Sequence, residues 1–199
     1  QKEFIAGFEM ACDKGRLAVA ETILPAILNY REGLLVEVCR KHSTPAVQLL
    51  LQKGIDTDDR VLSFYGACEK GRGPTVQLLL ELGIPSEAQL RGFHMACEKG
   101  RDLTVTILLQ QGISCREQED AFREACRDER HYVVVSLLRD GDISEEAILR
   151  EMEPARSRMQ RLYSRYSIVW PKPVYKVLKE HLERDRPPPK SARSAQYYC

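Results

Sequence analysis

The sequence lacks the features that mark several large classes of protein. Its 199 residues hold no apolar run that approaches the roughly 20 residues needed to span a membrane. The formal net charge is only +1, so the chain as a whole is not a polycation. There is no signal-peptide pattern at the start. Because the first residue is Gln1 rather than Met, the sequence leaves open whether the chain is a fragment of a longer protein.

Sequence patterns that carry catalysis or hold cofactors are also missing. There is no Gly-rich phosphate loop, no nucleophile elbow and no His-Glu-x-x-His motif. The seven cysteines include no Cys-x-x-Cys pair. The histidines do not cluster with them in sequence and stand at His42, His94, His131 and His181. We therefore expect a protein that is not an enzyme and that uses neither a metal nor a cofactor.

What the sequence does contain is an internal repeat. Five cysteines mark it, at intervals of 27, 29, 29 and 29 residues: Cys12, Cys39, Cys68, Cys97 and Cys126. A period in this range is typical of stacked repeat architectures, in which each unit contacts its neighbours along the chain. Such stacks present an extended surface, and that surface mostly binds other proteins.

The residues around each cysteine repeat as well. Three residues after it comes glycine in three units, with His42 and Glu129 in the other two. Eight residues after it comes valine in four units and Ala20 in the first. A large apolar residue stands four positions before each cysteine: Phe8, Leu35, Phe64, Phe93 and Phe122.

Each unit has the pattern of two short helices. In the fourth unit, Ser86 with Gln89 fits a capping box, as Ser114 with Glu117 does in the fifth. The apolar residues then recur at helical spacing up to the cysteine. Gly100 suits the left-handed residue that ends a helix. Neither helix of a unit can bury its apolar face alone, which predicts stacking on the neighbouring unit.

The five periodic cysteines are best explained as small core residues. Packed helices lie about 8–10 Å apart, whereas the Cα atoms of a disulfide lie within about 7 Å. We therefore expect free buried thiols, in a reducing compartment such as the cytosol or nucleus. Cys115 and Cys199 fall outside the period, and we expect them to be more exposed.

At this point the units resemble a known family. The run from Gly92 to Arg101, continuing to Gly112-Ile113, is similar to an ankyrin repeat, with His94 on the family's histidine and Cys97 on its second alanine. The resemblance covers residues 4–144. Ankyrin units have about 33 residues, and these shorter units lack the stretch that builds the projecting β-hairpin fingers. The resemblance implies an all-α, helix-turn-helix solenoid of stacked ankyrin-like repeats with C-terminal capping helices.

The resemblance also implies a function and a set of contact residues. Ankyrin proteins are non-catalytic scaffolds for protein–protein interaction, and the two residues after the second alanine often contact the partner. Carried over, these partner-binding residues are Asp13, Lys14, Arg40, Lys41, Glu69, Lys70, Glu98, Lys99, Arg127 and Asp128. The alternative is that these charges only solvate and cap helix ends, where a lysine stabilises by ~0.3–1 kcal/mol. A row of arginines extends the charged set: Arg16, Arg72, Arg101 and Arg130.

The C-terminal region differs from the repeats in charge. Residues 150–199 hold 12 Lys and Arg and 5 Asp and Glu, a balance of +7, which leaves −6 for the rest. Residues 145–152 look like the first helix of a sixth unit, which Pro154 should interrupt. Helices are expected again at 156–166 and 174–183. We therefore expect a repeat stack over residues 1–153, a capping helical region over 154–183 and a flexible tail over 184–199.

Two other functions for this region stay open. Its basic residues and aromatics, over residues 156–193, have a composition that binds nucleic acid, although no recognised motif is present. Alternatively, the chain is an adaptor that holds a client on the repeats. Trp170-Pro171-Lys172-Pro173 resembles faintly the box by which some ankyrin proteins dock a ubiquitin-ligase scaffold. The leading expectation is a monomeric, intracellular module that binds a protein partner and spans no membrane.

Overall fold

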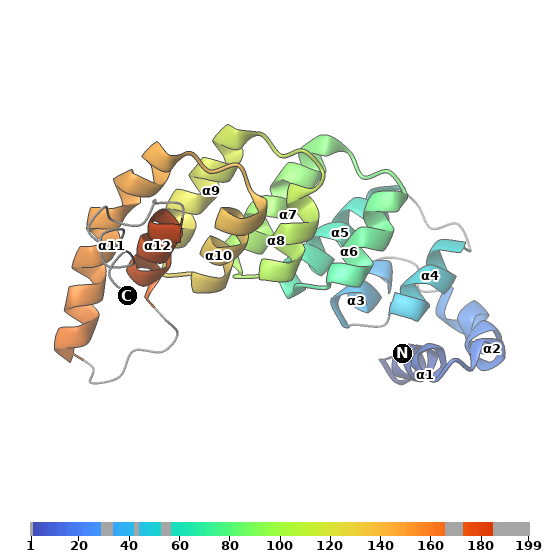
Figure 1. Ribbon diagram of the computed structural model, residues 1–199. Coiled ribbons are helices and arrows are strands. Elements are labelled where there is room, and N and C mark those ends of the chain that lie inside the picture. Colours follow the sequence, from blue (N-terminus) through green and yellow to red (C-terminus); the bar gives the residue numbers. More distant parts are fainter. Residues whose placement is uncertain (1, 29–33, 42–43, 53–56, 166–172, 185–199) are drawn as a thin grey trace, which may run out of the picture. The chain divides into compact units, whose positions relative to one another are not determined.

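The computed structural model (Figure 1) describes residues 2–28, 34–41, 44–52, 57–165 and 173–184. Throughout these ranges the regular secondary structure is α-helical, with no β-strand. The predicted all-α fold class is therefore confirmed. The chain divides into two compact units, residues 1–114 and residues 115–199.

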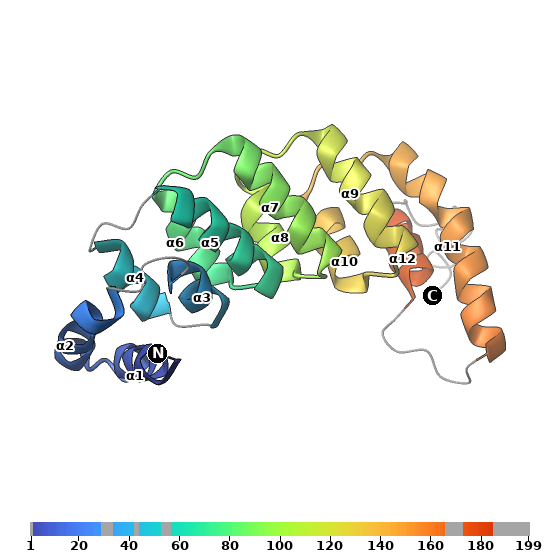
Figure 2. The ribbon, with the colours of Figure 1, turned by 180° about the vertical axis from the view of Figure 1, so that it is seen from behind.

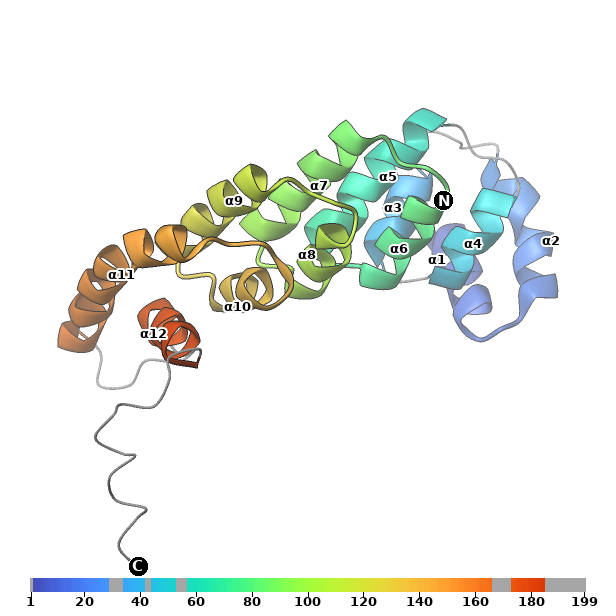
Figure 3. The same cartoon turned by 45° about the horizontal axis from the view of Figure 1, so that its top comes forward.

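In the first unit, consecutive helices pack in pairs, each pair forming a helical hairpin. Helix α3 packs against α4, α5 against α6 and α7 against α8. The first helices of successive pairs pack on one another, α3 on α5 and α5 on α7, and the second helices do so from α4 through α6 to α8. Figures 2 and 3 show these two layers. The helices of this unit are α1 (Lys2–Asp13), α2 (Leu17–Leu28), α3 (Leu34–Lys41), α4 (Thr44–Gln52), α5 (Thr57–Lys70), α6 (Gly73–Glu81), α7 (Ser86–Glu98) and α8 (Asp102–Leu109).

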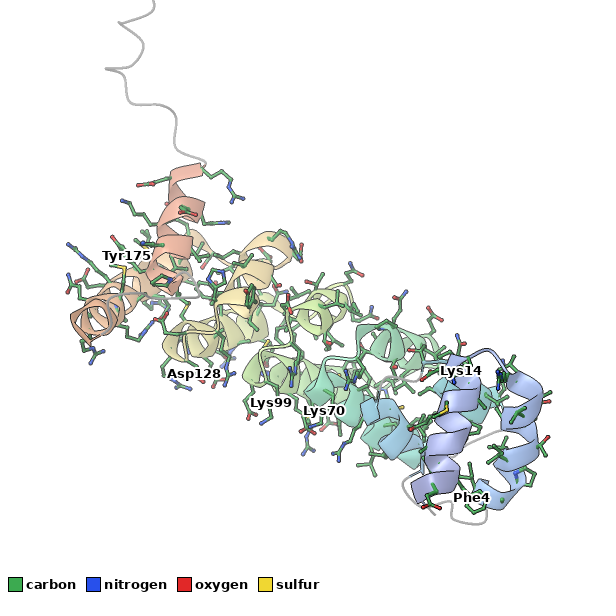
Figure 4. All side chains as sticks on the ribbon, turned by 90° about the horizontal axis from the view of Figure 1, so that it is seen from below. Phe4, Lys14, Lys70, Lys99, Asp128 and Tyr175 are labelled. Atoms are coloured by element: carbon green, nitrogen blue, oxygen red, sulfur yellow. The ribbon has the colours of Figure 1, made fainter. Side chains whose placement is uncertain are left out.

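The first helical pair does not follow this pattern. Helix α1 packs against its partner α2 and against α4, a second helix. In a regular stack it would pack chiefly against the first helix α3. Figure 4 shows the consequence, because Lys14 at the end of α1 lies well apart from Lys70 and Lys99. The packing of first helix on first helix therefore does not extend to α1.

The repeated apolar residues form the core of both units, as predicted. Each residue four positions before the periodic cysteine is at most 1% exposed: Phe8, Leu35, Phe64, Phe93 and Phe122. The residues eight positions after it are buried as well, from Ala20 to Val134. These two sets of residues form the apolar faces of the helices, which neither helix of a pair can cover alone.

The five periodic cysteines are buried free thiols, as expected. Burial raises the pKa of Cys39 to about 12, and it also raises the pKa of Cys68 and of Cys126. A thiol with such a pKa is neutral at physiological pH and behaves as a small apolar side chain. Cys115 is exposed, in agreement with its position outside the period, and Cys199 lies outside the described residues.

The ends of the first helices explain the residues that follow each cysteine. At the end of α7, the N–H of Gly100 bonds the Cys97 carbonyl at 3.1 Å. The next N–H, that of Arg101, bonds the Ala96 carbonyl at 2.8 Å. This pair of bonds is the Schellman motif, whose left-handed residue is Gly100 with a φ of 68°. The same pair of bonds recurs at Gly15, Gly71 and Glu129.

The second unit has two hairpin helices followed by a longer terminal pair. Helix α9 packs against α10, α11 packs on α9, and α12 packs on both α10 and α11. The terminal pair therefore contacts the hairpin as one repeat contacts the next, first helix on first helix and second on second. The bounds are α9 (Cys115–Arg127), α10 (His131–Asp140), α11 (Glu145–Arg165) and α12 (Val174–Arg184).

Helix α11 corrects one sequence prediction. Pro154 was expected to interrupt the helix, yet α11 continues through it to Arg165. A proline removes the bond to the carbonyl four residues earlier, here that of Arg150. Both residues are exposed, so this carbonyl lies on the side of the helix that water can reach. The expected boundary between residues 153 and 154 therefore falls inside a continuous helix.

The helices of the fold begin with different kinds of cap. Ser144 caps α11, because its Oγ accepts a hydrogen bond from the N–H of Ala147 at 3.2 Å. The capping box expected for α7 is wrong, since Pro85 occupies the cap position and makes no side-chain bond. Gln89 instead donates its amide to the carbonyl of Ile84 at 2.7 Å. The side chain therefore fixes the loop that precedes the helix.

Candidate functional site

The predicted partner-binding residues all stand at the C-terminal ends of first helices. Each pair occupies the last position of a helix and its neighbour, from α1 to α9. Figure 4 shows Lys70 and Lys99 at equivalent ends of α5 and α7. The side chain of Lys41 lies outside the described part. The ten residues are Asp13, Lys14, Arg40, Lys41, Glu69, Lys70, Glu98, Lys99, Arg127 and Asp128.

Several of these charges neutralise one another at the surface. Glu69 is paired on both sides, with Arg40 at 3.4 Å and with Lys70 at 3.3 Å. Lys99 pairs with its neighbour Glu98 at 2.7 Å. Exposed ion pairs of this kind contribute about 0–1 kcal/mol each. The pairs agree with the capping alternative, in which these residues serve helix ends and solubility.

Two arginines of the extended row connect neighbouring units. Arg72 donates Nε to the carbonyl of Arg40 at 3.1 Å, and Arg101 donates Nε to the carbonyl of Glu69 at 2.9 Å. These carbonyls belong to the last turn of a first helix, where no backbone N–H is available. Burial, and the proximity of Arg101, lower the pKa of Arg72. The arginines therefore act as clamps between successive first helices.

A different part of the first helices forms a hollow. It lies between α5 and α7 and has a volume of about 570 Å³. The same repeat positions of both helices face it, since Tyr65 and His94 each stand three residues before a periodic cysteine. We call it the α5–α7 hollow, and its lining residues are Val61, Tyr65, Pro85, Glu87, Ala88, Leu90, Arg91 and His94.

Arg91 is the distinctive residue of the α5–α7 hollow. Its guanidinium carbon lies 5.1 Å from the centre of the Tyr65 ring, a cation–π contact. In the part of the chain that the structure describes, Arg91 makes no ion pair. Leu62, next to the lining residue Val61, has 56% of its surface exposed. The region thus combines an aromatic ring, aliphatic side chains and a cation that makes no ion pair with the described carboxylates, Glu87 included.

The equivalent positions of α9 have another chemistry. Seven, six and three residues before Cys126 stand Glu119, Asp120 and Arg123. Arg123 pairs with Asp120 at 3.0 Å, and Glu119 accepts hydrogen bonds from Ser144. In α5 these three positions hold Val61, Leu62 and Tyr65, and in α7 they hold Leu90, Arg91 and His94. The apolar character of the α5–α7 hollow is therefore specific to the repeats that contain α5 and α7, and it is not shared by the repeat that contains α9.

A second, smaller hollow lies in the second unit, between α10 and α12. Its volume is about 270 Å³. Arg139 already holds Asp140 through two hydrogen bonds of 2.8 and 2.6 Å. His181 and Arg184 stand in the last turn of α12, where cations stabilise a helix end. The lining is His131, Val135, Leu138, Arg139, Val177, Glu180, His181 and Arg184.

The basic C-terminal region uses several of its cations within the fold. Arg150 pairs with Glu146 at 2.8 Å and Arg158 with Glu129 at 3.1 Å. Tyr175, seen in Figure 4, is half-buried on α12. The other aromatic residues considered for nucleic-acid binding fall on the undescribed residues or, for Tyr163, on an undescribed side chain. The nucleic-acid interpretation of residues 156–193 therefore stays a prediction.

The residues that line the α5–α7 hollow are absent from the ten predicted contact residues. The transferred family pattern points to the helix ends, and the hollow lies along the helix bodies. The sequence does contain one signal for the hollow, which is the difference in residue type at equivalent positions of the repeats. A comparison of these positions sets Leu62 and Arg91 against Asp120, and Tyr65 and His94 against Arg123.

The described residues hold no group of three or more histidine, cysteine, aspartate or glutamate side chains placed to bind a metal ion. None of the helices seen there combines the length and the hydropathy that crossing a bilayer requires. Compared with models of known protein families, with curated protein sequences and with solved structures, the chain gave no match.

Proposed function

We propose that this protein is a non-catalytic protein-interaction module, built as an ankyrin-like solenoid, that binds a protein partner at the α5–α7 hollow. One observation carries the proposal. The surface positions of a repeated helix are apolar, aromatic and cationic around the hollow, whereas the same positions of α9 hold ion-paired charges. The buried positions of the repeat do not change in this way.

The composition of the hollow suits a protein interface. Tyrosine and arginine dominate the binding energy of interfaces and are enriched at their centres. Tyr65 and Arg91 are placed against each other by their cation–π contact before any partner arrives. A surface that is ordered in advance loses less entropy on binding. The packing of α5 on α7 supplies this order.

The C-terminal pair completes the proposed solenoid. Helix α12 packs on α10 and α11 packs on α9, as a further repeat would. Terminal repeats close such a stack with a more polar outer face. We infer that α11 and α12 serve as this cap, so that their removal lowers the stability of the second unit.

Affinity capture tests the proposal with two matched substitutions. Leu62→Arg places a charge beside the hollow, on a side chain that is 56% exposed. Leu149→Arg makes the same change on α11, at a leucine that is 50% exposed, and is the control. We expect a partner captured by the wild-type chain to be lost with Leu62→Arg and retained with Leu149→Arg. Circular dichroism would verify that both variants fold.

The opposite pattern would move the function elsewhere. Partners retained by Leu62→Arg and lost by charge reversal at Lys70 and Lys99 would restore the helix ends as the binding surface. If the wild-type chain and both variants capture no macromolecule, and the protein turns over a small molecule, the proposal of an interaction module is contradicted.

A further inference from the structure

Resting on the proposed function, the chemistry of the α5–α7 hollow also specifies its partner. We propose that the hollow binds a segment of another protein in which a carboxylate stands beside a large apolar side chain. The carboxylate pairs with Arg91, and the apolar side chain covers Val61 and Leu90. This segment is therefore acidic and amphipathic.

The carboxylate follows from the state of Arg91. The guanidinium carbon of Arg91 lies 5.1 Å from the centre of the Tyr65 ring, so the cation–π contact occupies one planar face of the guanidinium. The N–H donors of a guanidinium lie in its plane, in a fork that matches the two oxygens of a carboxylate. No described residue of the chain pairs with these donors. By contrast, Arg40, Arg123 and Arg158 all pair with carboxylates of the chain.

The hollow is also lined by a carboxylate, that of Glu87, and by the His94 ring. Glu87 lies four residues before Arg91, a spacing that usually gives an ion pair on a helix. No such pair is present here. Glu87 stands instead in the first turn of α7, where a carboxylate is stabilised by the positive helix terminus. The His94 ring makes an edge contact with Phe93, with 5.6 Å between the ring centres.

The apolar side chain follows from the rest of the lining. Val61 and Leu90 contribute aliphatic surface, and Leu62 adds an exposed side chain next to them. Covering such surface stabilises a complex because apolar area is removed from water. An ion pair that is shielded by apolar neighbours is also screened less by salt. The two features therefore reinforce each other when they lie side by side in the partner.

A display experiment with the full-length chain tests the inference. A library of short random peptides is selected on the purified protein, and one consensus peptide is synthesised. We expect Asp or Glu near a large apolar residue in the enriched peptides. Arg91→Ala should weaken the consensus peptide by about tenfold or more, since a charge-assisted hydrogen bond contributes that much. Arg116→Ala, at an exposed arginine of α9, is the matched control and should leave affinity unchanged.

Charge reversal makes the test specific. Arg91→Glu should reject the acidic peptide and accept the same peptide with lysine in place of its carboxylate. The acidic partner would be contradicted by peptides whose binding requires Leu62 but that carry no acidic residue, or by peptides whose affinity Arg91→Ala leaves unchanged. The proposed function would stand in both cases. An enriched basic consensus would also contradict the acidic partner and leave the proposed function standing. Failure of Leu62→Arg to affect any selected peptide would overturn both proposals.

Discussion

The same repeated helix has two different surfaces in this chain. In the first unit, α5 and α7 leave a hollow lined by Tyr65 and Arg91, and the cation has no carboxylate. In the second unit, the equivalent face of α9 carries the ion pair between Asp120 and Arg123. Phe93 and Phe122, on the opposite face, are buried alike. The comparison teaches that the repeat constrains the core positions and leaves the surface positions available for specialisation.

The helix ends differ between the two regions as well. Gly100 ends α7 in the left-handed conformation, and Glu129 adopts the same conformation after α9 with a φ of 54°. A side chain in this conformation costs about 1 kcal/mol or more. Glu129 offsets that cost by binding both helices of the terminal pair. Its carboxylate accepts bonds from Arg158 of α11 at 3.1 Å and from the N–H of Val174 of α12 at 3.2 Å.

Arg158 continues the clamp seen in the first unit. It donates to the carbonyl of Cys126 at 2.9 Å, near the end of α9. Arg101 makes the corresponding bond to Glu69 at the end of α5. The second unit therefore keeps the arginine clamp and adds a carboxylate beside it. This addition attaches the terminal pair where the first unit continues with another repeat.

The largest expected effect tests whether the two cores are equivalent. Phe93→Ala and Phe122→Ala should each destabilise the protein by ~3–5 kcal/mol, because each leaves a cavity at a side chain that is at most 1% exposed. Urea unfolding followed by circular dichroism measures both. A cost below ~1 kcal/mol for one of the two would show that its unit relaxes into the cavity and that the cores differ. Tyr132→Ala, at a side chain that is 57% exposed, is the control.

The next effect concerns how closely the first helices approach. A Cβ added at Gly92 of α7 would lie 2.5 Å from Phe64 Cε1 and 3.0 Å from Cys68 Sγ, both buried on α5. Gly92→Ala should therefore destabilise by ~1–3 kcal/mol through overpacking. Gly7 occupies the same repeat position on α1, where an added Cβ meets nothing within 4 Å. Gly7→Ala should stabilise by ~0.5–1 kcal/mol, because alanine favours helix. Thermal unfolding that ranks the two variants in the reverse order would refute the packing of α5 on α7.

A third prediction tests how the end of α9, at Glu129, differs from the end of α7, at Gly100. Glu129→Gly relieves the left-handed strain and removes the bonds to Arg158 and Val174. A hydrogen bond to a charged group contributes ~1.5–3 kcal/mol, so the balance should be a net loss of ~1–2 kcal/mol. Hydrogen exchange of the α12 amides should speed up, while α9 and α10 change little. Unchanged exchange in α12 would mean that Glu129 does not hold the terminal pair.

Most of the fold follows from the repeat in the sequence. The periodic phenylalanines, cysteines and valines identify the buried face, and the glycine that follows three of the five cysteines identifies the helix end. The placement of α1 on α4 does not follow, because α1 carries the same apolar residue, cysteine and glycine as the first helices of later repeats. The continuity of α11 through Pro154 does not follow either, since it depends on whether the unpaired carbonyl meets solvent. The solenoid as a whole stays a prediction.

The candidate site was less accessible to sequence reasoning than the fold. The family pattern points to the helix ends, and Lys70 or Lys99 carry charges that any helix end tolerates. The residues of the α5–α7 hollow have no spacing of their own that identifies them. Their meaning appears when α5 and α7 are known to pack, because Tyr65 and Arg91 then face each other from different helices.

The last prediction uses pH to test the buried interior that both units share. Burial raises the pKa of Cys39 on α3 from 9.0 to about 12, and it raises that of Cys126 on α9 as well. The folded thiols stay protonated above pH 9, whereas the unfolded thiols ionise, so the unfolded state binds fewer protons. Stability is thus fully retained below about pH 9 and declines as pH rises towards 12, by at most ~1.4 kcal/mol per pH unit for each thiol.

Alanine variants isolate this contribution from the lysines and tyrosines that titrate in the same range. Thermal unfolding between pH 8.5 and about 11 should show a shallower alkaline decline for Cys39→Ala and Cys126→Ala than for the wild-type chain. Cys115→Ala is the comparison: it is chiefly a hydrogen bond to Asp142, and not burial, that raises the pKa of this exposed thiol, so its removal should flatten the decline less than removal of a buried thiol. If only one buried variant flattens the decline, the two units differ in how well they exclude water. Equal flattening would place their difference at the surface, where Arg91 and Asp120 occupy the same position of the repeat.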